Sequence, residues 1–305
     1  MGTDARRGQG VDQSSPMPRP SIAPSPAEMD RATNEPRRRR RREWFLPTFT
    51  ALVLAYLFIP VVVMALFGFN DFQGRFNLVW QGFTLEHYSG IFDIPELNEA
   101  VANSLFVAAV STVTATVLGT LIALALTRFQ FRARPALNLL IFVPMATPEI
   151  IMGVSLLSLF VTLTWERGMT TIIIAHIMFS ISYVVVTVKA RTSSFDRNLE
   201  DAAQDLGADG WTTFWTVTFP LIFPGILAGA LLAFVLSIDD YVITTFNAGG
   251  TITLPLWIYG VSRFGVPAQV NVIGTIIFLF GVVYVIVSLL RSRQGAQPPP
   301  VLTKG

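Results

Sequence analysis

The stretch LEDAAQDLGADGWTTFWTVTFP, residues 199–220, is a long polar interruption between apolar segments of the chain. A helix is predicted for residues 199–206, because apolar side chains recur there at helical spacing, namely Leu199, Ala202, Ala203 and Leu206. Gly207 is suited to end this helix. Asp209 can cap a second helix, which carries Trp211, Phe214, Trp215 and Val217. The stretch therefore predicts two short amphipathic helices, followed at Pro220 by a return into apolar sequence.

The composition around this stretch is that of a membrane protein. Mean hydropathy is +0.54, with 52% apolar and only 14% charged residues. Uncharged runs cover residues 44–70, 100–127, 135–148, 168–188, 210–238 and 266–290. A helical span needs about 20 apolar residues, so most runs suffice alone. The third becomes long enough if Glu149 is tolerated and the helix continues to Thr164. We predict an all-α protein with six transmembrane helices.

The basic residues predict the orientation of these spans. Residues 44–291 form the predicted transmembrane domain, and the tails 1–43 and 292–305 are expected to be disordered. Of the 22 Lys and Arg residues, all but Arg75, Arg167 and Arg263 fall in the tails or in loops on one side. By the positive-inside rule both termini and the 199–220 loop are cytoplasmic. This asymmetry accounts for the basic residues, so nucleic acid is not an expected partner.

Catalysis within the chain is not expected. There is no cysteine, and His87 and His176 are too few and too far apart for a metal cluster. A phosphate-cradling loop needs a Gly-Lys pair, yet Lys189 and Lys304 both lack a preceding glycine. The chain is therefore predicted to be neither an enzyme nor a cofactor-binding protein. Active transport would need ATP and Mg²⁺ bound by another subunit.

Within the 199–220 stretch, the spacing resembles the EAA loop of ATP-binding-cassette (ABC) importer permeases. The matching elements are Asp201-Ala202-Ala203, Gly207, Val217 and Phe219-Pro220, with mild departures at Asp201, Val217 and Phe219. The resemblance implies a type I ABC importer permease whose coupling helix sits in a groove of a separate ATPase. The coupling residues it implies are Glu200, Asp201, Ala202, Ala203, Gly207 and Pro220. The alternative is an amphipathic re-entry loop without a partner.

The similarity extends over residues 45–290 to the spermidine/putrescine ABC importer permeases, of the second permease type. It rests on TPEIIMG at 147–153, VVVTV at 184–188, LSIDD at 236–240 and LPLWIY at 254–259. This resemblance implies a polyamine permease in the bacterial inner membrane. The implied assembly adds a second, different permease, two ATP-binding subunits and an extracytoplasmic binding protein.

Three acids stand inside predicted spans, where a charge is costly and needs a reason: Glu149, Asp239 and Asp240. Counting helical rise places them at a similar depth in the outer half of the membrane. Pro144 and Pro148 predict that the third span is kinked or broken there. Carboxylates at one level, with Tyr183 and Tyr241 nearby, would suit a flexible chain of ammonium groups. Alternatively, these acids pair with arginines or cap broken helices.

The two aspartates are expected to differ. In a continuous helix Asp240 shares a polar stripe with Ser237, Tyr241, Thr244 and Asn247. Asp239 shares an apolar stripe with Val235, Leu236, Val242 and Ile243. We therefore predict that Asp240 faces the substrate path and that Asp239 makes a structural pair or contacts the partner permease.

Other classes of function stay open. Glu149, His176 and the two aspartates could form the proton relay of a secondary transporter. Such carriers usually show larger repeated halves and have no reason for an EAA-type loop. His176 is expected to be a hydrogen-bonded packing residue. Further alternatives are an importer permease for another small cationic or organic solute, and a membrane scaffold that transports nothing.

Overall fold

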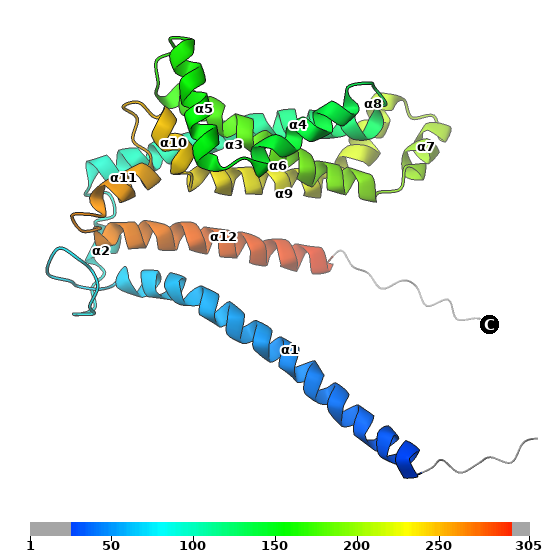
Figure 1. Ribbon diagram of the computed structural model, residues 1–305, viewed down its shortest axis with the longest axis horizontal. Coiled ribbons are helices and arrows are strands. Elements are labelled where there is room, and N and C mark those ends of the chain that lie inside the picture. Colours follow the sequence, from blue (N-terminus) through cyan, green and yellow to red (C-terminus); the bar gives the residue numbers. More distant parts are fainter. Residues whose placement is uncertain (1–25, 295–305) are drawn as a thin grey trace, which may run out of the picture. The chain divides into compact units, whose positions relative to one another are not determined.

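The computed structural model describes the backbone of residues 26–294, with side chains for 44–283 and 286. This part of the chain has no strand, only one bridge between Asn70 and Phe83. The chain divides into two compact units, residues 1–62 and 63–305. In chain order the helices are α1 Pro26–Phe67, α2 Glu86–Ser89, α3 Pro95–Arg128, α4 Arg134–Ala146, α5 Glu149–Thr162, α6 Met169–Ser194, α7 Asn198–Asp205, α8 Gly210–Thr213, α9 Phe219–Ile238, α10 Val242–Asn247, α11 Leu254–Val261 and α12 Ala268–Gln294 (Figure 1).

Helix α1 accounts for most of the first unit. Its part Trp44–Phe67 is apolar and, with 24 residues, long enough to cross a membrane. Residues 26–43, for which disorder was predicted, have helical backbone continuous with α1. Extending an existing helix needs no new nucleus, and the Arg37–Arg42 run consists of good helix formers. The rest of the N-terminal tail and residues 295–305 lie outside the described residues; α12 reaches Gln294, three residues into the predicted C-terminal tail.

The second unit contains the other predicted spans. Helices α3 and α6, and the stretch Gly210–Ile238 that ends with α9, are each long and apolar enough to cross a membrane. Helices α4 and α5 pass the same test together but are bent by 108°. The predicted break in span three is thereby confirmed, because Thr147 before Pro148 is extended and ends α4. The sixth predicted span corresponds to α12, whose described apolar part is Ala268–Val283.

Helices α3, α6 and α9 pack against one another and form the core of this unit. Val184 of α6 lies between two glycines. A Cβ at Gly119 of α3 would come within 2.7 Å of Val184 Cγ1, and one at Gly229 of α9 within 3.4 Å of Val184 Cα. Small residues at these crossings allow close backbone approach. The surrounding core is made of Ala115, Ala123, Leu126, Val184, Val185, Val188 and Ala233.

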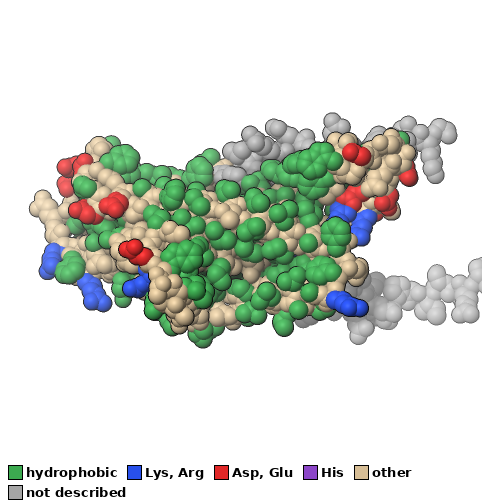
Figure 2. Space-filling model, turned by 90° about the horizontal axis from the view of Figure 1, so that it is seen from above, with side chains coloured by type: hydrophobic (Ala, Val, Ile, Leu, Met, Phe, Trp, Pro, Cys, Tyr) green, Lys and Arg blue, Asp and Glu red, His purple; other side chains and the backbone are tan. Residues whose placement is uncertain are grey.

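The two ends of this three-helix core carry different structures. Helices α7 and α8 lie at one end, and α5, α10 and α11 at the other (Figure 1). On the face in Figure 2, apolar side chains cover the middle, and charged side chains gather towards the ends. This is the distribution expected for helices that cross a bilayer.

The fifth span was predicted to be one helix from Pro224 to Thr245, and the structure differs from that prediction. Helix α9 ends at Ile238, and α10 starts only at Val242. The Asp240 carboxyl group accepts the backbone N–H groups of Ile243 (3.3 Å) and Thr244 (2.7 Å). Such a side-chain cap starts a new helix and competes with continuation of the old one. Asp239 and Asp240 therefore lie at a break, not inside a helix.

Candidate functional site

A cavity of about 540 Å³ opens where the two broken spans meet. The turn between α4 and α5 forms one wall, the break between α9 and α10 another, and α6 contributes Phe179 and Tyr183. All five residues predicted for the substrate path line it: Glu149, Tyr183, Asp239, Asp240 and Tyr241. Broken helices are tolerated in membranes where they line a cavity, which is the arrangement here.

Glu149 and Asp239 are exposed acids of this cavity. Glu149 is the first residue of α5, where a carboxylate complements the positive end of the helix dipole. Asp239 is the C-terminal cap of α9, where the carbonyl end of the helix already carries partial negative charge. The Asp239 side of the cavity is therefore the more negative one and favours a cation.

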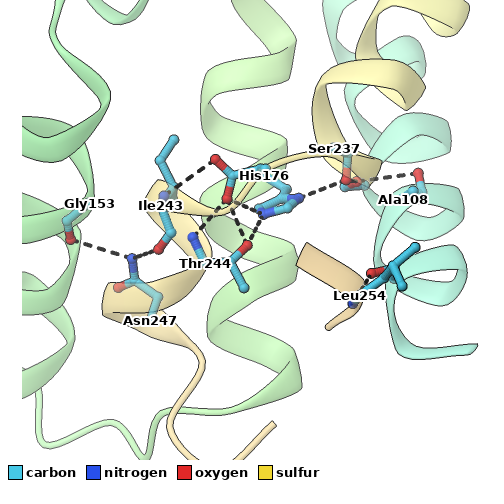
Figure 3. A network of polar contacts seen from close by, with 11 residues as sticks. Ala108, Gly153, His176, Ser237, Ile243, Thr244, Asn247 and Leu254 are labelled. Carbon is cyan, nitrogen blue, oxygen red and sulfur yellow. Dashed lines mark hydrogen bonds and ion pairs between the residues drawn. The ribbon is translucent and has the colours of Figure 1, made fainter. Parts of the chain in front are cut away.

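Asp240 is turned away into a buried polar network. Its side chain is 5% exposed, and its Oδ2 lies 3.3 Å from Nε2 of His176, which is 1% exposed. The Thr244 hydroxyl donates to the same Oδ2 at 2.7 Å. Figure 3 shows the His176 ring between Ser237 and Thr244. The ring nitrogens lie 2.7 Å from Ser237 Oγ and 2.9 Å from Thr244 Oγ1.

Both aspartates line the cavity, and their exposure is the opposite of what the predicted polar and apolar stripes suggest. Asp240 makes the structural pair, and Asp239 is the one exposed to the cavity. The prediction assumed one continuous helix through both residues, and the break at 239–241 removes that periodicity. The expectation that His176 is a hydrogen-bonded packing residue is confirmed by its buried contacts.

Two tyrosines complete the lining. Tyr183 is half-buried on α6 beside the apolar cluster of α5, α6 and α10. Tyr241 lies at the break itself, with its ring centroid 4.7 Å from that of Tyr259 on α11. Aromatic faces next to carboxylates suit an ammonium group.

At the other end of the core, α7 spans Asn198–Asp205, one residue from the predicted bounds at each end, and is followed by the predicted glycine turn. Gly207 has φ +91°, and the N–H groups of Gly207 and Ala208 donate to Gln204 and Ala203 at 2.9 and 3.0 Å, which is a Schellman ending. Asp209 then caps α8 by accepting from Thr212 N at 2.9 Å. The hydrogen bonds from Thr212 lower the pKa of Asp209 below its ordinary value.

The predicted coupling residues of α7 do not share one side. Asp201 and Ala202 are exposed, and Ala203 is half-buried. The apolar residues Leu199 and Leu206 are exposed too, Leu206 to 90%. Glu200 is the exception, because it is turned into the protein and pairs with Arg128 at the end of α3. An ATPase bound to the outer face of α7 would not contact it. Arg128 and Thr218, the partners of Glu200, could not be predicted from the sequence. They lie 72 and 18 positions away from Glu200, and no local pattern joins residues so far apart.

Pro220 is the second residue of α9, a position that needs no N–H donor. A π-helical segment, Phe214–Thr218, precedes it. Rings on this segment and its flanks form a continuous ladder: Trp211, Phe214, Trp215, Phe219 and Phe223. Trp211 at its start is exposed.

Several apolar spans, a cavity at two broken spans and an exposed amphipathic helix between two spans define a multi-pass membrane permease. The family described as binding-protein-dependent transport system inner membrane component matches residues 115–294, and the chain belongs to it. The chain is 39% identical over 247 residues to the spermidine/putrescine transport system permease protein PotC of Escherichia coli K12, covering 81% of this chain and 93% of that protein. It is 37% identical over 255 residues to the putrescine transport system permease protein PotI of the same strain, covering 81% and 90%.

The fold is also that of solved ABC importers. A crystal structure of a bacterial ABC transporter involved in the import of the acidic polysaccharide alginate superposes with a TM-score of 0.58. The identity is 17%, with 84% of this chain and 98% of that chain covered. This likeness supports the type I ABC importer permease architecture.

Proposed function

We propose that this protein is a permease subunit of an ATP-driven importer of polyamines. It works with a second, different permease, a dimer of ATP-binding subunits that hold ATP and Mg²⁺, and an extracytoplasmic binding protein. It lies in the bacterial inner membrane with both termini and the 199–220 loop in the cytoplasm. The 199–220 loop is its contact with the ATPase.

The carrying observation is the negative wall of the cavity. Asp239 is exposed at the carbonyl end of α9, so carboxylate and helix dipole add to the same negative potential. Glu149 adds a second carboxylate on α5. A molecule with ammonium groups separated by methylenes can reach both, with its apolar part against Tyr183 and Tyr241. The names of the relatives, spermidine/putrescine and putrescine permeases, point to the same class.

The outer face of α7 supports the coupling part of the proposal. Leu199 on α7 and Leu206, the residue directly after this eight-residue helix, are apolar and exposed. Exposed apolar patches with a polar rim are typical of protein interfaces. The Schellman ending and the Asp209 cap fix both ends of the turn, so that α7 can transmit force as a rigid body.

The test is uptake by the reconstituted importer. Proteoliposomes holding the full complex, with ATP inside and binding protein outside, should take up labelled spermidine or putrescine and be unaffected by a protonophore. Asp239→Asn should abolish uptake, whereas Asp93→Asn, an exposed acid outside the cavity, should not. Uptake that collapses with the proton gradient would favour a secondary transporter. ATP-driven uptake of another solute, with polyamines ineffective, would replace the substrate class only.

A further inference from the structure

Glu200 stands apart from its neighbours on α7. It is 8% exposed, whereas Leu199 and Asp201 on either side are exposed. A carboxylate so covered is unfavourable unless it is paired and hydrogen-bonded. Its partners lie outside α7, and each belongs to a different transmembrane helix.

The first partner is the end of α3. Arg128, the last residue of α3, donates from Nη1 and Nη2 to the two carboxylate oxygens of Glu200. Two parallel bonds of this kind fix orientation as well as distance. The same guanidinium lies over the Phe195 ring, 5.2 Å from its centroid. Arg197 adds a hydrogen bond from Nη2 to the Thr127 carbonyl oxygen at 2.6 Å. The end of α3 is thus held at several points by the segment that leads into α7.

The second partner is the base of α9. The hydroxyl of Thr218, which is 5% exposed, donates to Glu200 Oε1. Thr218 is the last residue of the π-helical segment that leads into α9. π-Helical turns are rare, often occur at functional sites and mark places where a helix can rearrange. Burial raises the pKa of Glu200, but the bonds from Arg128 and Thr218 outweigh it and hold the pKa below its ordinary value.

We propose that Glu200 is a positioning residue that ties α7 to the ends of both α3 and α9, so that a displacement of α7 moves two membrane helices together. The proposal rests on the proposed coupling function of the 199–220 loop. Without this tie no side chain of α7 itself would be bonded to α3, and the Arg197–Thr127 hydrogen bond would hold only the segment before α7. Helix α7 could then tilt with less movement of α3, and ATP hydrolysis would continue with less transport.

The first test needs only the permease. The chain has no cysteine, so Gln204→Cys on the exposed side of α7 gives a single site for a nitroxide spin label. Glu200→Gln and Arg128→Gln should each raise the mobile fraction of the label about tenfold, as loss of about 1.4 kcal/mol of charge-assisted bonding would. Arg132→Gln is the matched control, because Arg132 is exposed in the loop after α3, and it should leave the spectrum unchanged.

The second test uses the reconstituted complex. Wild-type complex must first hydrolyse ATP and take up solute; failure at that step counts against the proposed function, not the tie. Glu200→Gln should keep ATP hydrolysis while uptake per ATP falls about tenfold. The exchange Glu200→Arg with Arg128→Glu should restore part of both readouts. Thr218→Val, nearly isosteric, removes only the bond to α9 and provides the comparison if a charge variant does not assemble. The proposal would be overturned if Glu200→Gln and Thr218→Val both kept the wild-type label mobility and the wild-type uptake per ATP.

Discussion

Replacing His176 by leucine removes the partner of a buried carboxyl group with little change in volume. The variant loses two hydrogen bonds, to Ser237 and Thr244, and the contact with Asp240. Each neutral hydrogen bond contributes about 1 kcal/mol. Removing one member of a buried pair costs about 3–5 kcal/mol, because the Asp240 carboxyl group stays buried with only its hydrogen bonds from Ile243 and Thr244. With side-chain exposures of 1% and 5%, water cannot replace the lost partner. We expect the free energy of unfolding to fall by about 3–5 kcal/mol.

The measurement is an unfolding titration with SDS in mixed micelles, followed by circular dichroism. The double variant His176→Leu/Asp240→Asn separates charge from packing. An amide at position 240 has one oxygen, so it keeps one of the two backbone hydrogen bonds, from Ile243 or from Thr244, and it carries no charge to leave unpaired. The double variant should therefore be at least as stable as His176→Leu alone. A loss under about 1 kcal/mol for His176→Leu, or full additivity of the two changes, would refute this account of the network.

Four further predictions concern the cavity and the loop. Asp239→Asn should lower polyamine uptake at least about tenfold with normal assembly, because the cavity loses a full charge. Uptake is measured with radiolabelled polyamine and assembly by co-purification of the subunits. Unchanged uptake would count against a cation path. Gly207→Ala should destabilise the end of α7 by about 1–2 kcal/mol, because φ at this position is +91°. A Cβ there would meet nothing within 4 Å, so the cost comes from the backbone conformation alone. The loop should be cleaved faster by a protease, and wild-type resistance would contradict the prediction. Folding lowers the pKa of Glu200, so its contribution to the stability of the fold is complete above the ordinary pKa of 4.5 and is lost as pH falls through the lower folded pKa. The mobility of a spin label at position 204 should therefore stay constant around neutral pH and rise only in acid. A rise near neutral pH would be inconsistent with this. A cysteine at Gln204 should be labelled only from the cytoplasm and one at Gln81 only from outside; the opposite pattern would invert the topology.

The membrane spans and the break in span three could be predicted because their causes are local in sequence. Apolar length predicts a span, and Pro148 restricts the residue before it wherever it occurs. The same holds for Gly207 and Asp209 at the turn between α7 and α8. The break after Ile238 was missed because no glycine or proline marks it. It depends on Asp240 capping α10, and the same carboxyl group is held by His176 from a helix distant in sequence.

The candidate cavity was predicted as a set of residues but not as an arrangement. Depth along each span brings Glu149 to the level of the two aspartates, and the structure places all three on one cavity. Which aspartate is the more exposed depends on the helix break, and the periodicity of one continuous helix does not include that break. The partners of Glu200 were missed for a similar reason. Arg128 comes from the end of another span, and no pattern within α7 indicates that contact.

The seating of Val184 between Gly119 and Gly229 limits how this permease can open. The approach is closest at Gly119, where a Cβ would come within 2.7 Å of Val184, and at Gly229 the spacing is ordinary contact. We therefore expect α3, α6 and α9 to move together as one block. Relative motion is then expected at the joints next to this block: the bent pair α4 and α5, and α10 after its break. The cavity lies at these joints, so the same two discontinuities that shape it also allow its walls to change position.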